Sequence, residues 1–256
     1  MDAPAPPRVA LVTGAARRLG REIALALARD GWDVAVHYGR SAADAHDTVA
    51  QLRALGRRAQ ALPARLDDEA EVLGLLPAAA AALGAVGCVV NNASHFEFDE
   101  AASASFASMQ AHLMPNLAAP VLLARELARA LPDGAEGVVV NLLDQKLWAY
   151  NPDFLSYTLS KAGLAAATTM LAQALAPRVR VVGVAPGLTL PSYLQDEAAF
   201  RRAHREHSPL GRSSTAADVA ASVAFAVANR SLTGTTIVCD GGQHLRPPPR
   251  DVSFLP

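Results

Sequence analysis

Tyr157 and Lys161 are four residues apart in a stretch with a helical pattern, and Asp144 precedes the tyrosine by thirteen residues. Residues four apart lie on one face of a helix, so the phenol and the ammonium are predicted neighbours. A phenol has a pKa of about 10, and a nearby ammonium lowers that pKa because it favours the phenolate. The pair is conspicuous because the chain has only two lysines. We therefore predict that Tyr157 donates a proton with the help of Lys161, although a solvated helical face would also place the two together.

A glycine turn between the first predicted strand and the first predicted helix is suited to binding phosphate. It runs from Thr13 to Gly20, and Arg18 stands where such turns usually have a middle glycine. Gly14 and Gly20 permit a tight turn and a close approach of helix to strand, and the helix N-terminus offers free N–H groups to a pyrophosphate. A purely structural turn from strand to helix could carry the same glycines.

The residues at the end of the second predicted strand select the cofactor. NAD-binding chains often place Asp or Glu there to bind the ribose hydroxyls. This chain has the run His37-Tyr38-Gly39-Arg40-Ser41, which contains no carboxylate. Arg40, Ser41 and Arg17 can instead supply two guanidinium groups and a hydroxyl to a 2′-phosphate, which favours NADP(H). The alternative is that Arg40 is simply an exposed charge after a strand.

Alternating strands and helices must hold these residues in place. Strands are predicted, from short apolar runs bounded by turn residues, at Val9–Thr13, Asp33–Tyr38, Ala59–Leu62, Cys88–Asn91, Gly137–Leu142, Val179–Val184 and Thr236–Cys239. Helices are predicted at Leu19–Arg29, Ser41–Leu55, Glu69–Leu83, Ala104–Leu131, Asp153–Ala176 and Ala216–Ala228. This alternation predicts an α/β fold with a doubly wound, Rossmann-like parallel sheet and helices on both faces.

The alternation continues without a linker or a repeat, so we expect a single domain over residues 1–256. Residues 1–7 and 246–256 are rich in proline and are predicted to be irregular tails. The segment Leu188–Arg212 has weak periodicity and mixed charge. We expect it to form a mobile flap over a site.

The composition predicts a globular enzyme that acts on a small molecule. Hydrophobic residues make up 51% of the chain and charged residues 18%, which suffices for a full core. The net charge of −1 argues against a basic surface for nucleic acid. No apolar run is long enough to span a membrane, and the N-terminus lacks a signal peptide, so a cytoplasmic location is expected. The histidines lack the spacing of metal ligands, so no metal site is predicted.

In their order along the chain, these motifs resemble those of the short-chain dehydrogenases/reductases from Thr13 to Gly242. The resemblance rests on the Thr-Gly turn, Asn91-Asn92-Ala93, Asn116, Tyr157/Lys161, Pro186-Gly187 and Asp240-Gly241-Gly242. It implies that Tyr157 is the catalytic acid, that Lys161 lowers its pKa and holds the nicotinamide ribose, and that Asn116 supports a proton-relay water through its backbone. The cofactor site that it implies comprises Gly14, Arg17, Arg18, Leu19, Gly20, His37, Tyr38, Arg40, Ser41, Leu66, Asn92, Ala93, Ser94, Lys161, Pro186, Gly187 and Thr189. The resemblance also implies that long apolar helices pair across subunits in a homotetramer or homodimer.

One departure from the family pattern narrows the expected substrate. The family usually has a serine thirteen residues before the tyrosine, where its hydroxyl donates to a substrate carbonyl, but this chain has Asp144. An ionised carboxylate would repel a developing alkoxide. A carboxyl group kept protonated by burial could instead pass a proton through Tyr157. Asp144 therefore suits the reduction of a C=N bond better than that of a simple ketone.

Pteridine reductases, a branch of this family, are similar to this chain at the same points. They carry Asp in place of Ser, an Arg in the phosphate turn, and a His-Tyr-x-Arg-Ser-Ala-Ala run like that at His37–Ala43. Their Asn-Asn-Ala-Ser-x-Phe matches residues 91–96, and their Pro-Gly-Leu-Ser corresponds to residues 186–189. The resemblance implies that Phe96 stacks a pterin against the nicotinamide, so a dihydropterin is the expected acceptor. The substrate-contacting residues that it implies are Arg18, Ser94, Phe96, Asp144 and Tyr157.

Two alternatives stay open. Asp144 could be tolerated in a carbonyl reductase in which Tyr157 carries the proton alone, acting on a 3-oxoacyl thioester, a sugar or a small ketone. A non-catalytic NADP-binding regulatory protein would need no proton donor, and the intact Tyr157, Lys161 and Asn116 argue against it.

The family also commonly ends its third strand with an Asp that accepts from the adenine amino group. Arg65 stands there in this chain, which leaves the adenine to the backbone of Leu66 or to the nearby Asp67 or Asp68.

Overall fold

Seven parallel strands form the centre of the computed structural model, which describes residues 7–191, 194 and 197–254. The strands are β1 (Val9–Val12), β2 (Asp33–Tyr38), β3 (Ala59–Pro63), β4 (Val86–Asn91), β5 (Gly137–Leu142), β6 (Val179–Pro186) and β7 (Thr236–Cys239). They are ordered β3-β2-β1-β4-β5-β6-β7 in the sheet. The predicted fold class, a doubly wound parallel sheet, is confirmed.

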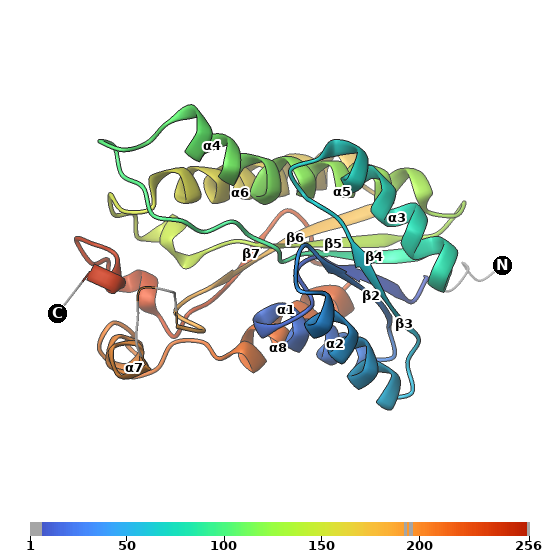
Figure 1. The fold of residues 1–256 in the computed structure, drawn as a ribbon, viewed down its shortest axis with the longest axis horizontal. Coiled ribbons are helices and arrows are strands. Elements are labelled where there is room, and N and C mark those ends of the chain that lie inside the picture. Colours follow the sequence, from blue (N-terminus) through green and yellow to red (C-terminus); the bar gives the residue numbers. More distant parts are fainter. Residues whose placement is uncertain (1–6, 192–193, 195–196, 255–256) are drawn as a thin grey trace.

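Helices cover both faces of the sheet (Figure 1). One face carries α1 (Arg18–Arg29), α2 (Ala42–Ala54) and α8 (Ala216–Ala228). The other face carries α3 (Glu69–Leu83), α4 (Phe106–Leu113), α5 (Ala119–Ala130) and α6 (Leu155–Leu175). Each layer packs its apolar stripe on the sheet, so a hydrophobic core lies on either side of the strands.

The sequence of the strands explains why the sheet is buried between two layers. Every residue of β4 and β5 is buried, and both strands are nearly continuous runs of apolar residues. Such runs are typical of parallel strands covered on both faces. The strand order reverses between β1 and β4, because the chain leaves β3 at one edge and returns beside β1. The carboxyl ends of strands at such a reversal form a crevice that binds ligands.

The predicted helix Ala104–Leu131 is interrupted by a π-helical turn, η1 (Met114–Ala118), which separates α4 from α5. Pro115 in this turn has no N–H to donate. The N–H of Ala119 bonds to the carbonyl of Met114, five residues earlier, and not to the residue four earlier as in an α-helix. The apolar pattern continues through the turn, so the sequence predicted one helix where the structure has two with a wider turn between them.

The segment Leu188–Arg212 contains a helix that was not predicted, α7 (Glu197–Glu206). Its three arginines and two glutamates hide the apolar signal, and only Phe200 and Ala203 are buried among its described side chains. In the C-terminal tail, residues Val252–Phe254 form a short 3₁₀ turn, η4, within the stretch predicted to be irregular. Residues 1–6 and 255–256 of the predicted tails lie outside the described chain. Within residues 7–191, 194 and 197–254, no helix combines the length and apolar character that crossing a bilayer requires.

Candidate active site

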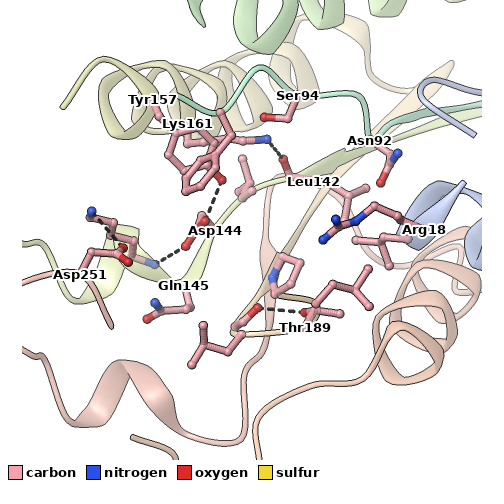
Figure 2. Close-up of a pocket in the computed structure, with 18 of the residues that line it drawn as sticks. Arg18, Asn92, Ser94, Leu142, Asp144, Gln145, Tyr157, Lys161, Thr189 and Asp251 are labelled. Carbon is pink, nitrogen blue, oxygen red and sulfur yellow. Dashed lines mark hydrogen bonds and ion pairs between the residues drawn. The ribbon is translucent and has the colours of Figure 1, made fainter. Parts of the chain in front are cut away.

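A cavity of about 620 Å³ opens at the carboxyl ends of the strands, beside the reversal between β1 and β4. Strands, helix N-termini and the C-terminal tail all contribute to its wall (Figure 2). The predicted site residues that line it are Gly14, Arg17, Arg18, Leu19, Gly20, Asn92, Ala93, Ser94, Phe96, Asp144, Tyr157, Lys161, Pro186, Gly187 and Thr189. The fold thus brings most of the predicted cofactor and substrate residues into one space.

Tyr157 and Asp144 are joined by a direct hydrogen bond in the wall of this cavity. Tyr157 lies in the first turn of α6 and Asp144 lies two residues beyond the end of β5. The tyrosine Oη donates to Asp144 Oδ2 at 2.7 Å (Figure 2). The other carboxylate oxygen accepts from the backbone N–H of Lys146 at 2.8 Å. Lys161 lies one turn along α6, and its Nζ donates to the carbonyl of Leu142 at 2.7 Å. The predicted trio is therefore assembled, with the carboxyl group bonded to the phenol.

Burial sets the charges of this trio. The pKa of Asp144 is raised because burial disfavours its carboxylate, although hydrogen bonds from Lys146 and Tyr157 oppose that effect. Burial and then the charge of Asp144 raise the pKa of Tyr157 well above its usual value. Burial lowers the pKa of Lys161 to about 8. The predicted lowering of the Tyr157 pKa by Lys161 is therefore wrong for this structure, since the ammonium faces Leu142 and lies 5.8 Å from the centre of the tyrosine ring.

Asn116 is buried outside the cavity lining, on the π-helical turn η1. Its side-chain amide donates to the carbonyl of His95 at 2.9 Å and to Ser160 Oγ at 3.0 Å, and its carbonyl oxygen accepts from the N–H of His95 at 2.7 Å. These bonds tie α6 to the loop that carries Ser94 and Phe96. Asn116 thus supports the site from behind.

Phe96 stands beside the proton donor. Its ring stacks on Phe154 with centroids 4.3 Å apart and meets the edge of the Tyr157 ring at 4.7 Å. Because it also lines the cavity, Phe96 presents an aromatic wall next to the tyrosine hydroxyl. A flat ring can pack against such a wall.

The glycine turn is packed so closely that side chains would not fit. A Cβ on Gly20 would lie 2.2 Å from the carbonyl oxygen of Gly14, which itself has a φ of 63°. Arg18 adopts a φ of 53° at the position where a middle glycine is usual, and its guanidinium donates to the carbonyl of Pro191 at 2.7 Å. Arg17 precedes α1 in an extended conformation and makes no side-chain cap, so the helix N–H groups stay available to an anion.

The remaining predicted cofactor residues, His37, Tyr38, Arg40, Ser41 and Leu66, are described residues that lie outside the cavity lining. His37 is buried, its Nδ1 accepts from the N–H of Gly14 at 3.0 Å, and its Nε2 bonds to the carbonyl of Ala64 at 3.1 Å. It therefore holds the glycine turn in place. Arg40 is exposed, and Ser41 precedes α2 without capping it. Gly39 does line the cavity, so the cavity extends to this end of β2.

The comparisons with known proteins agree with this geometry. The family model described as short chain dehydrogenase matches residues 8–201. The chain belongs to the short chain dehydrogenase family. Among solved relatives, FolM Alternative dihydrofolate reductase 1 from Brucella canis, complexed with NADP, is 41% identical with a TM-score of 0.89 over 93% of this chain and 94% of that one. A short chain dehydrogenase from Burkholderia cenocepacia, in complex with NADP, is 35% identical with a TM-score of 0.86 over 93% and 98%. The 3-oxoacyl-[acyl-carrier-protein] reductase FabG of Staphylococcus aureus is 30% identical over 92% of this chain and 98% of its own length.

This short chain dehydrogenase also has cavity residues that the sequence did not point to. They lie after β5 and in the C-terminal tail and are Gln145, Lys146, Pro248, Asp251, Val252 and Ser253. The one available signal was Lys146, since it is the only lysine besides Lys161. The tail gave no signal because its proline-rich sequence has no periodicity.

In the described part of the chain, no three histidine, cysteine or acidic side chains cluster in a way that could hold a metal ion.

Proposed function

We propose that this protein reduces the C=N bond of a pteridine-type substrate such as a dihydropterin, with NADPH as the hydride donor. The hydrogen bond between the buried Tyr157 and the half-buried Asp144 is the observation that carries this proposal. A serine hydroxyl would donate to a carbonyl oxygen, whereas a buried carboxyl group favours its protonated form and can supply a proton to nitrogen. The similarity to FolM Alternative dihydrofolate reductase 1 supports the same substrate class.

Several residues of the cavity wall take part in the proton transfer. NADPH, when bound, supplies the hydride that adds to the carbon of the C=N bond. The Tyr157 hydroxyl donates its proton to the nitrogen, so the C=N bond becomes CH–NH. For this step the hydroxyl, which donates to Asp144 Oδ2 in the structure, turns toward the nitrogen. The protonated Asp144 then donates its proton to the tyrosine oxygen across the same 2.7 Å contact, and solvent returns a proton to the carboxylate. Phe96 packs against the flat ring, and the Lys161 ammonium stands one helical turn behind the tyrosine.

The site fits NADP(H), the cofactor with which two of the solved relatives are complexed. The close-packed glycine turn and the uncapped N-terminus of α1 can hold the pyrophosphate. Thr13 Oγ1 accepts from the N–H groups of Asn92 and Ala93 at 2.9 and 3.0 Å, which fixes the two loops that flank the cofactor position. Arg40 and Ser41, at the end of β2, can bind the 2′-phosphate.

Replacement of Arg40 with Ala is expected to raise the Kd for NADPH about 10- to 100-fold and to leave the Kd for NADH nearly unchanged. The reason is that hydrogen bonds to a charged group contribute about 1.5–3 kcal/mol each, and only NADPH has the 2′-phosphate. Fluorescence titration of both nucleotides measures the two constants. Arg29→Ala is the matched control, because that exposed arginine lies at the other end of α1. Equal weakening of both nucleotides would refute this selectivity.

The rate is expected to fall as the pH rises through about 8. Lys161, with a pKa of about 8, carries its proton below that pH and loses it above. Asp144, whose pKa is raised, likewise keeps its proton on the acidic side. The proton that restores Tyr157 comes from Asp144, and the Lys161 ammonium stabilises the phenolate left after the transfer. We therefore expect kcat/KM to decline on the alkaline side. A rate that climbs through pH 8 would contradict these roles.

The experiment that tests the proposed function follows NADPH oxidation by the purified protein with a panel of acceptors. Dihydrobiopterin, dihydromonapterin and dihydrofolate represent the pteridines, and acetoacetyl-CoA represents the carbonyl compounds. Turnover of the pteridines well above that of acetoacetyl-CoA is expected. The similarity to FabG makes reduction of a 3-oxoacyl thioester the second candidate, and turnover of acetoacetyl-CoA alone would favour it.

A further inference from the structure

The C-terminal tail forms one wall of the cavity. After β7 the chain runs through a short 3₁₀ turn, η3 (Gln243–Leu245), and a proline run to η4, and four tail residues line the cavity. An ion pair and a hydrogen bond, both to Asp153, hold the tail in place. The Arg250 guanidinium pairs with Asp153 at 2.7 Å, and the backbone N–H of Asp251 donates to the same carboxylate at 2.6 Å. Phe254 packs its ring 5.0 Å from Phe98. The tail is therefore anchored on both sides of Asp251.

The carboxylate of Asp251 can accept further hydrogen bonds. One oxygen accepts from the backbone N–H of Ser253 at 3.0 Å, and the other lies 3.7 Å from Lys146 Nζ. A carboxylate offers about four acceptor positions, so these contacts leave some of them open. The Asp251 side chain is 19% exposed, whereas the Lys146 side chain is 5% exposed. The cavity therefore meets the carboxylate, while the ammonium lies behind it and donates to the carbonyl of Asp153.

A second acceptor lies in the same region. Gln145 lines the cavity, and its Oε1 is buried without a hydrogen-bond partner among the described residues. A buried acceptor without a donor is costly, so such groups commonly mark a position where a ligand or a water donates. Asp251 and Gln145 both lie on the side of the cavity away from Arg18 and Asn92 (Figure 2). They therefore face the substrate end rather than the end proposed for the cofactor.

We propose that Asp251 is a specificity-determining residue that, together with Gln145, binds hydrogen-bond donors of the substrate and disfavours an anionic substituent. The inference rests on the proposed function and narrows it. A substituent that extends from a reacting ring at Tyr157 toward this wall meets the Asp251 carboxylate. A neutral hydroxyalkyl group donates hydrogen bonds to a carboxylate, whereas a glutamate tail brings like charges together. The substrate class is thus a pteridine with a neutral, hydroxyl-bearing side chain rather than a folate.

Calorimetric binding of biopterin and folate to the complex of the protein with NADP⁺ tests this inference without turnover. The wild type should bind biopterin more tightly than folate. In Asp251→Asn, which keeps an oxygen for the Ser253 N–H and removes the charge, the affinity for folate should rise about tenfold relative to that for biopterin. Asp133→Asn is the control, because it removes an exposed charge between α5 and β5, outside the cavity lining. An unchanged ratio of the two affinities, or equal weakening of both ligands, would overturn the proposal.

A second pair of ligands separates this inference from the proposed function. If the wild type binds neither biopterin nor folate, the pteridine proposal fails. The charge selection is then tested with acetoacetyl-CoA and acetoacetyl-N-acetylcysteamine, which share the reacting group but differ in charge. Asp251→Asn should raise kcat/KM for the CoA ester about tenfold relative to the neutral ester. The same change for both esters would refute charge selection by Asp251, whatever the substrate.

Discussion

Tyr157→Phe is expected to lower kcat by at least about 100-fold while changing the Kd for NADPH less than about twofold, because a positioned general acid contributes about 10²–10⁴ to the rate. The substitution removes one hydroxyl and keeps the ring that packs against Phe96. Asp144 loses a hydrogen bond that lowers its pKa, so its neutral form is favoured further and no unpaired charge is left in the wall. Steady-state turnover of dihydrobiopterin and a fluorescence titration of NADPH measure the two effects.

Tyr150→Phe is the matched control for this experiment. Tyr150 is 62% exposed and lies shortly before α6, so the loss of its hydroxyl should change neither constant. A Tyr157→Phe protein that lost NADPH affinity in parallel with turnover would show that the tyrosine holds the cofactor rather than donating the proton. Full turnover in that variant would show that Tyr157 is not the proton donor. Tight NADPH binding by the wild type without turnover of any acceptor would favour the regulatory alternative.

The sequence located the catalytic centre because the fold follows from local patterns. Asp144 comes two residues after the end of a buried strand, and Tyr157 and Lys161 share one face of the helix that follows. In a parallel sheet the carboxyl ends of strands meet at one edge, so residues at these points are brought together. The glycine turn follows β1 by the same rule. Motifs at strand ends were therefore predictable without knowledge of the packing.

The features that the sequence did not reveal depend on long-range contacts. Asp251 reaches the cavity because Arg250 pairs with Asp153, and those two residues are 97 positions apart. The direction of the Tyr157 pKa shift depends on burial and on where the Lys161 ammonium points, neither of which spacing encodes. The apolar pattern of α4 and α5 runs through η1 without a break, so the π-helical turn had only Pro115 as a signal.

Asp144→Ser is expected to shift the substrate preference from a C=N bond toward a carbonyl group by at least about 100-fold. Serine cannot supply the proton that Asp144 passes to Tyr157, so turnover of dihydrobiopterin should fall by about 10²–10⁴. Its hydroxyl can donate to the oxygen of a ketone, and it removes a carboxylate that repels a developing alkoxide. The ratio of kcat/KM for dihydrobiopterin and for a neutral acetoacetyl thioester measures the shift.

Asp144→Asn separates the two effects of that change. Its amide oxygen can still accept from the N–H of Lys146, and its NH2 group takes the place of the oxygen that accepts from Tyr157. The side chain cannot hold the transferred proton. We expect it to lose pteridine turnover as Asp144→Ser does, and to gain less carbonyl reduction because it lacks the serine hydroxyl. If both variants keep the wild-type ratio of pteridine to carbonyl turnover, Asp144 is a tolerated variant of the family serine, and Tyr157 alone carries the proton. Thermal unfolding of both variants checks that the wall of the cavity is intact, so that a changed ratio reflects the chemistry at residue 144.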